Sequence, residues 1–296
     1  MNTSFSEELC LTNETGRMLY HKYAESMPII DYHCHLQPRD IWENKQFEDI
    51  GEMWLSGDHY KWRAMRTFGI DEKYITGTET SYYEKYLAFA EIVPQLIGNP
   101  LYIWCALELK RFFDIDEPLC KENAEDIYVR TKALIAEKNI TPRWCMEHSH
   151  VELVSTTEDP VDDLKYHIAM NEDPTLKTKV ITAFRPDKAM FVAKPGFAEY
   201  MKALENAADM KVTTFREMIE RRLIYFQKIT GTTVSDNGIP DFTWVDATEE
   251  EIEFIFQKAL RGEKLTKKED DQYRSAFLYE MGKLYCIHDY VMQLHI

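Results

Sequence analysis

The chain has 296 residues, and its 51 acidic and 35 basic side chains give it a formal net charge of −16 at pH 7. This acidic excess argues against a nucleic-acid partner, which requires a basic surface, and against simple attraction to an acidic membrane. Hydrophobic residues make up 45% of the chain and aromatic residues 13%, so we expect a globular protein with a large core rather than a disordered one.

The cysteine pattern and the N-terminal residues indicate in which cellular compartment we expect the protein. Six cysteines are scattered along the chain without a Cys-x-x-Cys pair. The first residues, Met1–Glu8, lack the basic start and apolar core of a signal peptide. No uncharged run approaches the roughly 18 residues of a membrane span. We therefore expect free thiols in a reducing cytoplasm and no membrane partner.

The first predicted elements are a helix at 7–26 and an isoleucine-rich strand at 29–35. His33 and His35 are two residues apart, so on a strand both imidazoles point to one face, where a single divalent metal can bind them. Cys34 faces the opposite side and is expected in the core. The alternative is a pair of hydrogen-bonded histidines at a strand end.

Helical periodicity dominates from about 41 to 149, and the segment Gly57–Arg66 is its most unusual stretch. It combines a histidine, a tyrosine and several cations within one short segment. One interpretation is a solvated helix face with an aromatic anchor. The other is an anion-binding loop in which Lys61, Arg63 or Arg66 binds a substrate carboxylate, because guanidinium groups bind carboxylates in bidentate fashion.

Strands alternate with helices after residue 149, which predicts parallel βαβ units. Polar residues gather at the carboxyl ends of these strands, where a barrel enzyme carries its chemistry. The predicted strands are 151–155, 179–184, 232–236 and 290–295, and the predicted helices are 197–207, 213–229, 248–260 and 266–287.

Three residues at these strand ends are candidates for a site. Arg185 follows the strand at 179–184, Asp236 ends its strand, and His295 ends the last one. Each has a structural alternative: a salt bridge to a neighbouring loop for Arg185, a turn or helix cap for Asp236, and a purely structural role for His295.

The chain resembles uronate isomerase, also called glucuronate isomerase, of the amidohydrolase superfamily. The resemblance spans essentially all 296 residues, and the segment around Gly57–Arg66 is its most specific part. The motifs that carry it are Asp31–Leu36, Trp54–Arg66, Ile97–Tyr102, Thr156–Pro160, Phe184–Lys188 and Leu294–Ile296. The resemblance implies an α/β fold, a distorted (β/α)₈ TIM-like barrel with a large helical insertion after strand 1. We thus expect a partial barrel at 1–40 and 150–296 and the helical insertion at 41–149.

Family membership would imply a metal-dependent reaction on sugar acids. The resemblance implies interconversion of D-glucuronate with D-fructuronate, and of D-galacturonate with D-tagaturonate, in uronate catabolism. By analogy, His33 and His35 hold a divalent metal, usually zinc, together with an aspartate from the eighth strand. His295 matches a fifth-strand histidine near that metal.

Aldose–ketose isomerisation moves a proton between carbons 2 and 1, and it requires an acid–base group and stabilisation of a developing oxyanion. We assign Tyr60 and His295 to catalysis, and His59, Arg185 and Asp236 to substrate binding. The alternative function is a metal-dependent hydrolase on the same scaffold. The cation-rich aromatic loop favours the isomerase, because a hydrolase depends on a metal-bound water more than on a carboxylate clamp.

Only five barrel strands can be counted, although a (β/α)₈ barrel takes about 250 residues before insertions. We therefore expect the sixth to eighth strands, with their aspartate ligand, to be missing, and the chain to be an N-terminal fragment. Such a fragment would expose an unpaired sheet edge, dissolve poorly, bind metal weakly and lack isomerase activity. The sequence leaves a homo-oligomer open.

Overall fold

The computed structural model describes residues 7–209, 214–239, 241 and 243–296, and for Glu7 and Leu9 only the backbone. The N-terminal segment 1–6 and the first residue of the helix predicted at 213–229 lie outside this part. The chain forms two compact units: a helical unit of Met1–Pro28 with Asn44–Ser149, and a sheet unit of Ile29–Glu43 with His150–Ile296. Residues 1–28, which we expected with the barrel, thus group with the helical unit.

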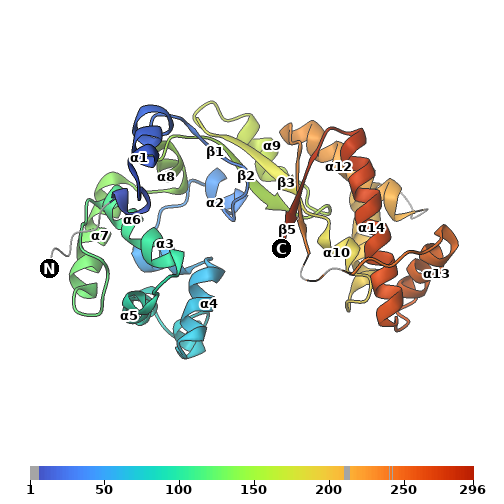
Figure 1. Ribbon diagram of the computed structural model, residues 1–296, viewed down its shortest axis with the longest axis horizontal. Helices are drawn as coiled ribbons and strands as arrows, with labels where there is room; N and C mark the ends of the chain where they lie inside the picture. The colour runs from blue at the N-terminus through green and yellow to red at the C-terminus, as the bar shows by residue number, and fades with distance from the viewer. Residues whose placement is uncertain (1–6, 210–213, 240, 242) are drawn as a thin grey trace. The chain divides into compact units, whose positions relative to one another are not determined.

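The sheet unit is built on five parallel strands in the order β1-β2-β3-β4-β5 (Figure 1). They are β1 (Ile29–Asp31), β2 (Val151–Glu158), β3 (Lys179–Phe184), β4 (Val234–Gly238) and β5 (Val291–His295). His33 follows β1 and His295 ends β5, the two edge strands, yet their ring centroids lie only 5.0 Å apart. The sheet therefore curls into a half-barrel, which confirms the predicted partial TIM-like fold.

The first predicted strand is wrong after Asp31. The Asp31 side chain accepts a hydrogen bond from the His33 backbone N–H at 3.4 Å, a local turn that competes with the sheet ladder. The register between β1 and β2 also shifts after Ile29. His33 and His35 consequently lie in the loop that follows β1, so strand alternation does not set the direction of their side chains.

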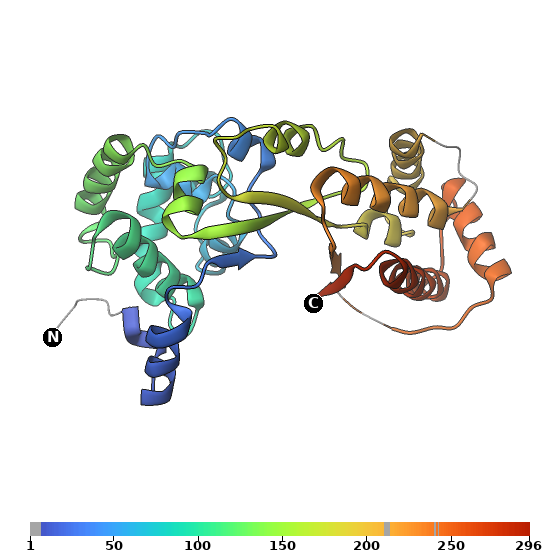
Figure 2. The same cartoon turned by 90° about the horizontal axis from the view of Figure 1, so that it is seen from above.

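Helices follow the strands of the sheet unit, and Figure 2 shows the long α14 leading into β5. Hydroxyl side chains define two helix starts, since Thr248 and Thr266 each form a capping box with the glutamate three residues later. The helices are α2 (Pro38–Trp42), α9 (Lys165–Asn171), α10 (Asp187–Met190), α11 (Phe197–Ala208), α12 (Phe215–Thr230), α13 (Glu249–Leu260) and α14 (Lys267–Ile287).

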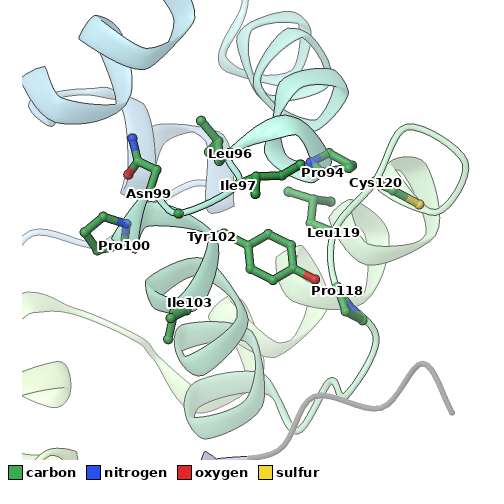
Figure 3. A pocket seen from close by; sticks show the side chains of 11 residues that line it. Pro94, Leu96, Ile97, Asn99, Pro100, Tyr102, Ile103, Pro118, Leu119 and Cys120 are labelled. Atoms are coloured by element: carbon green, nitrogen blue, oxygen red, sulfur yellow. The ribbon is translucent and has the colours of Figure 1, made fainter. Parts of the chain in front are cut away.

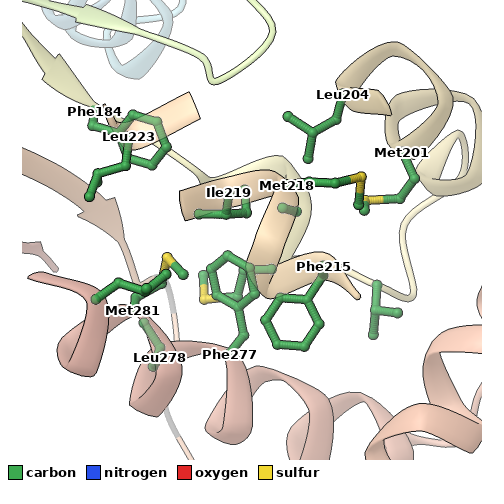
Figure 4. Close-up of a cluster of buried hydrophobic side chains, with 14 of the residues drawn as sticks. Phe184, Met201, Leu204, Phe215, Met218, Ile219, Leu223, Phe277, Leu278 and Met281 are labelled. Atoms are coloured by element: carbon green, nitrogen blue, oxygen red, sulfur yellow. The ribbon is translucent and has the colours of Figure 1, made fainter. Parts of the chain in front are cut away.

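The core of the sheet unit joins these helices to the sheet. Figure 4 shows Phe215 of α12 beside Phe277 of α14, with ring centroids 5.5 Å apart, and Met218 of α12 directed toward Met201 of α11, all of them buried. Phe184 at the end of β3 packs edge-on against Phe226 of α12, with ring centroids 5.1 Å apart. This packing fixes the end of β3, and with it the start of the segment that carries Arg185.

The helical unit has its own core, in which Trp54 packs edge-on against Phe89 with ring centroids 6.1 Å apart. Its helices are α1 (Glu14–Leu19), α3 (Ile50–Leu55), α4 (His59–Thr67), α5 (Tyr82–Ile92), α6 (Pro100–Phe113), α7 (Ala124–Lys138) and α8 (Pro142–His148). Three short 3₁₀ segments, η1 (Glu7–Cys10), η3 (Glu72–Tyr74) and η4 (Val93–Gln95), and the π segment η2 (Tyr20–Ala24) complete it.

The single helix predicted at 7–26 is wrong. Asn13 starts a new helix by accepting a hydrogen bond from the backbone N–H of Gly16 at 2.8 Å, and the chain is divided among η1, α1 and η2. Leu19 and Tyr23, two large apolar side chains of this stretch, are exposed. No helix in the described part of the chain has the length and apolarity needed to cross a membrane.

Candidate metal centre and active site

Three side chains, one from the loop after β1 and one each from β4 and β5, meet at the carboxyl edge of the half-barrel. The Nδ1 atom of His33 lies 3.6 Å from Oδ2 of Asp236, and Nδ1 of His295 lies 3.4 Å from Oδ1 of the same carboxylate. One ligand atom from each residue lies within 4.8 Å of the other two. Asp236 is the third residue of β4 rather than its last, so the predicted strand end at 236 is corrected.

Two atoms of this trio are buried without a hydrogen bond. Asp236 is only 1% exposed, yet neither its Oδ1 nor the Nδ1 of His295, 3.4 Å away, has a hydrogen-bond partner among the described residues. A buried carboxylate oxygen left unpaired is costly, so natural proteins leave few of them. Imidazole nitrogen and carboxylate oxygen are ordinary zinc ligands. The orphaned atoms therefore fit a divalent cation.

A cavity of about 440 Å³ opens on the trio. This volume lies within the range of small-molecule sites. Its lining residues are Asp31, Tyr32, His33, Asp236, Gln293, Leu294 and His295. Burial raises the pKa of Asp31, while the His33 backbone N–H acts in the opposite direction. Sequence reasoning missed Asp31 as a site residue, although it opens the motif that contains both histidines.

Arg185 lies between two carboxylates. Its Nε donates to Oδ2 of Asp187 at 2.8 Å, and its Nη1 donates to Oδ2 of Asp236 at 3.0 Å. The salt-bridge alternative for Arg185 is therefore realised, while its role in substrate binding stays a prediction. Burial raises the pKa of Asp187, and Arg185 acts against that shift. Sequence reasoning missed Asp187, for which the Arg-Pro-Asp spacing was the available signal.

His35 lies outside the trio, with its ring packed edge-on against His33 at 5.1 Å. It lines a separate cavity of about 360 Å³ that also contains Glu158 and His167. Its role as a metal ligand stays a prediction. Cys34, expected in the core, is instead half-buried and lines the same cavity as His35, and burial raises the pKa of its thiol to about 12.

A buried pair that the sequence did not reveal lies beside this second cavity. Oε2 of Glu158 accepts hydrogen bonds from the Thr156 hydroxyl at 2.8 Å and from Thr182, and it lies 3.7 Å from Nε2 of His167. Burial raises the pKa of Glu158 to about 7 and lowers that of His167 to about 4. Near neutral pH, His167 is therefore neutral and Glu158 lies close to its midpoint.

In the helical unit, the segment Gly57–Arg66 forms the start of α4. Asp58 caps this helix by accepting from the backbone N–H groups of Tyr60 at 2.9 Å and Lys61 at 3.1 Å. The buried Lys61 ammonium donates to Oδ2 of Asp58 at 2.6 Å, and Arg66 donates from Nε to Glu72 at 2.9 Å. Both cations thus have carboxylate partners within the protein. Arg66 is exposed, which favours the solvated helix face for that residue, whereas Lys61 is buried and does not lie on such a face.

His59 and Tyr60 begin α4, and their rings lie 4.4 Å apart at 32°. Tyr60 is 40% exposed, and the Arg63 guanidinium lies 6.0 Å from the centre of its ring. Both residues belong to the helical unit, whereas the metal trio belongs to the sheet unit. Substrate binding by His59 and catalysis by Tyr60 remain predictions.

The helical unit contains an apolar cavity of about 660 Å³ (Figure 3). Most of the motif Ile97–Tyr102 lines it, together with residues such as Leu119 and Cys120. Its walls are mainly aliphatic and contain no carboxylate, imidazole or cationic side chain. We infer that this motif serves the fold of the helical unit rather than the chemistry.

Comparisons with known proteins agree with one another. A family model described as glucuronate isomerase matches residues 1–296. Curated uronate isomerases from Caldanaerobacter subterraneus and Caldicellulosiruptor bescii are 42% and 43% identical over 100% of this chain and 64% of their own length. A crystal structure of uronate isomerase from Thermotoga maritima matches with a TM-score of 0.90 and 34% identity, over 99% of this chain and 64% of that one. A glucuronate isomerase structure from Caulobacter crescentus gives 0.88 and 26%, over 99% and 63%. The chain thus spans slightly under two thirds of the length of these relatives.

Proposed function

The chain belongs to the glucuronate isomerase family, and we propose that it carries active-site residues of an aldose–ketose isomerase acting on uronates. The observation that supports this best is the trio of His33, Asp236 and His295 at the carboxyl edge of a half-barrel. The expected pairs are D-glucuronate with D-fructuronate and D-galacturonate with D-tagaturonate. The isomerase is favoured over a metal-dependent hydrolase because the family model and the curated relatives are named for isomerisation.

We propose that His33, Asp236 and His295 hold a divalent metal, with zinc as the expected ion and His35 as a further predicted ligand. A bound metal would polarise a substrate oxygen and stabilise the negative charge that develops on it. Asp236 was expected to bind substrate. Its orphaned Oδ1 supports a role as metal ligand instead.

The remaining roles follow from the chemistry of isomerisation. One proton moves between carbons 2 and 1, and Tyr60 remains the proposed carrier; His295, which was expected to act in catalysis, is proposed as a metal ligand instead. Arg185, with 30% of its side chain exposed, and His59 are the proposed contacts to the sugar acid. We propose a cytoplasmic location, supported by six free cysteines; a homo-oligomer stays a prediction.

The test begins with the natural gene product that contains these residues, stripped of metal by a chelator and reloaded with zinc. It should convert D-glucuronate to a ketose, followed by NMR. Asp236→Asn should lower both zinc affinity and turnover by about 100-fold or more, because it removes a charged ligand. Glu172→Gln, an exposed carboxylate of the same unit, is the matched control. Hydrolysis of lactones or amides without ketose formation would overturn the proposal in favour of the hydrolase.

A further inference from the structure

The backbone between His33 and His35 is tied to the neighbouring strand. The N–H of Cys34 donates to the carbonyl of Ser155 at 3.0 Å, and the carbonyl of Cys34 accepts from the hydroxyl of Thr157 at 3.3 Å. Ser155 and Thr157 belong to β2 and lie two residues apart. Both polar backbone groups of the residue between the two histidines are therefore bound to β2.

The second of these bonds comes from a side chain and lies beyond the regular pairing of β1 with β2. That pairing ends at Asp31, which lies opposite Val154 and is the last residue of β1. The chain then turns out of the strand, so the backbone ladder no longer sets its path. The hydroxyl of Thr157 ties the loop to the sheet three residues further on, at Cys34.

The end of β2 is held from its other face, which gives the Thr157 hydroxyl a defined position. Side chains alternate along a strand, so Thr156 and Glu158 point away from the side of Thr157. The Thr156 hydroxyl donates to Glu158 at 2.8 Å and lies 2.9 Å from Nε2 of His167. Glu158 also accepts from the hydroxyl of Thr182 on β3. These four residues are buried, so the network fixes the β2 backbone on both sides of Thr157.

The tether at Cys34 bears on the direction of both imidazoles, because Cys34 joins one histidine to the other. The rings of His33 and His35 pack edge-on with centroids 5.1 Å apart, and His35 lines the same cavity as Cys34 and Thr157. Two ligands on one short loop bind a metal together only while the loop keeps both directed toward it. An untethered loop would lose conformational entropy on binding, and the affinity would fall.

We propose that Thr157 is a positioning residue that, by holding the carbonyl of Cys34, keeps His33 and His35 directed toward one divalent cation. This inference rests on the proposed function in taking both histidines as ligands of that metal. Thr157 acts through the backbone of Cys34 and not as a ligand.

Removal of the Thr157 hydroxyl should weaken metal binding, and its return should restore it. Thr157→Val should lower zinc affinity about tenfold, the scale on which groups that orient metal ligands act. Thr157→Ser keeps a hydroxyl and should recover most of that loss. The matched control is Thr178→Val, which removes a hydroxyl that donates to the carbonyl of Val151 at 2.8 Å, at the amino end of the same strand. It should leave zinc affinity unchanged.

The experiment measures zinc binding to the whole natural gene product, purified free of metal, by competition with a chromophoric chelator. Thermal unfolding in EDTA checks that each variant folds. If Thr157→Val does not fold, Thr157→Ala removes the same hydroxyl without placing a methyl group beside the Cys34 carbonyl, and the same loss is expected.

A fall for Thr157→Val that Thr157→Ser reverses and Thr178→Val does not share supports the proposal. Unchanged affinity in Thr157→Val, equal losses in the two valine variants, or a loss that serine does not reverse overturns it while leaving the metal centre in place. Absence of zinc binding by the unsubstituted protein would overturn the metal centre and this inference together.

Discussion

In the helical unit, the buried ammonium of Lys61 lies 2.6 Å from a carboxylate oxygen of Asp58, whereas in the sheet unit the buried carboxylate of Asp236 keeps one oxygen without a hydrogen bond. A second pair of residues shows the same contrast between paired and unpaired buried groups. In the helical unit, the Tyr128 hydroxyl donates to Asp49 at 2.8 Å. In the sheet unit, Glu158 is buried with only hydroxyl donors and a neutral histidine beside it.

This difference separates charges that stabilise a fold from charges that are available to a ligand. A buried ionisable group without a compensating charge lowers stability, and such groups concentrate at functional sites. The charge-rich segment Gly57–Arg66 is conspicuous in the sequence, yet Lys61 pairs with Asp58 and Arg66 pairs with Glu72 within the protein. The less conspicuous Asp236 lies within β4, close to His33 after β1 and to His295 of β5.

The largest expected effect is the loss of turnover in a Tyr60 variant. It would contradict the division between the two units, because it places part of the chemistry in the helical unit. Tyr60→Phe should lower turnover about 1,000-fold if the hydroxyl carries a proton in the reaction. The free energy of unfolding should change by less than about 0.5 kcal/mol, because a surface substitution of this kind removes one partly exposed hydroxyl. Turnover is measured with D-glucuronate, and stability by urea unfolding.

The matched control for that variant is Tyr86→Phe, which removes a fully buried hydroxyl from the same unit. It should leave turnover unchanged. Normal turnover in Tyr60→Phe, or equal losses in both variants, would remove Tyr60 from catalysis and restrict the chemistry to the sheet unit.

The next effect tests Glu158, the buried carboxyl of the sheet unit that has no cation beside it. Burial raises the pKa of Glu158 to about 7, so the folded protein holds this proton more tightly than the unfolded chain does. The Glu158 contribution to stability is therefore lost as pH rises from about 4.3 to about 7. Relative to the unsubstituted protein, Glu158→Gln should gain about 3 kcal/mol of stability between pH 4 and pH 8.

The measurement is urea unfolding of both proteins at several pH values. His167 contributes the opposite slope below about pH 6.5, since burial lowers its pKa to about 4. It lies 3.7 Å from Glu158, so the difference is read above that pH as well, where the histidine is neutral in both the folded and unfolded chains. Glu172→Gln, which removes an exposed carboxyl of the same unit, is the control for loss of a surface charge. A pH-independent difference for Glu158→Gln would show that this carboxyl is not desolvated.

Much of the sheet could be predicted from the sequence. The strand at 179–184 was predicted with its observed bounds, because it is a short apolar run closed by Arg185 and a proline. The order and parallel direction of the strands follow from their alternation with helices, and the structure confirms them. The first strand could not be placed correctly, because its end depends on a side-chain turn at Asp31 that competes with the ladder.

The candidate site was predictable residue by residue but not as an assembly. His33, Asp236 and His295 were each noticed beside or within a predicted strand, yet their meeting depends on the curl of the sheet. Asp187 and the Glu158–His167 pair were missed because their partners come from other elements. Burial and long-range pairing, which shift their pKa values, leave no local pattern in the sequence.

The smallest expected effect concerns two ion pairs of the helical unit. Their burial determines how much each contributes to the free energy of unfolding. Lys61→Met should lower the free energy of unfolding by about 2 kcal/mol, because it leaves the partly buried Asp58 carboxylate without its cation. Arg66→Met should lower it much less, because exposed ion pairs contribute little. The side chains of Arg66 and Glu72 are 47% and 53% exposed.

Each substitution removes one positive charge from the same helix and introduces the same side chain, so urea unfolding of the two variants isolates the effect of burial. If Lys61→Met costs no more than Arg66→Met, the Lys61–Asp58 pair acts like a surface pair, and compensated burial no longer distinguishes the helical unit from the sheet unit.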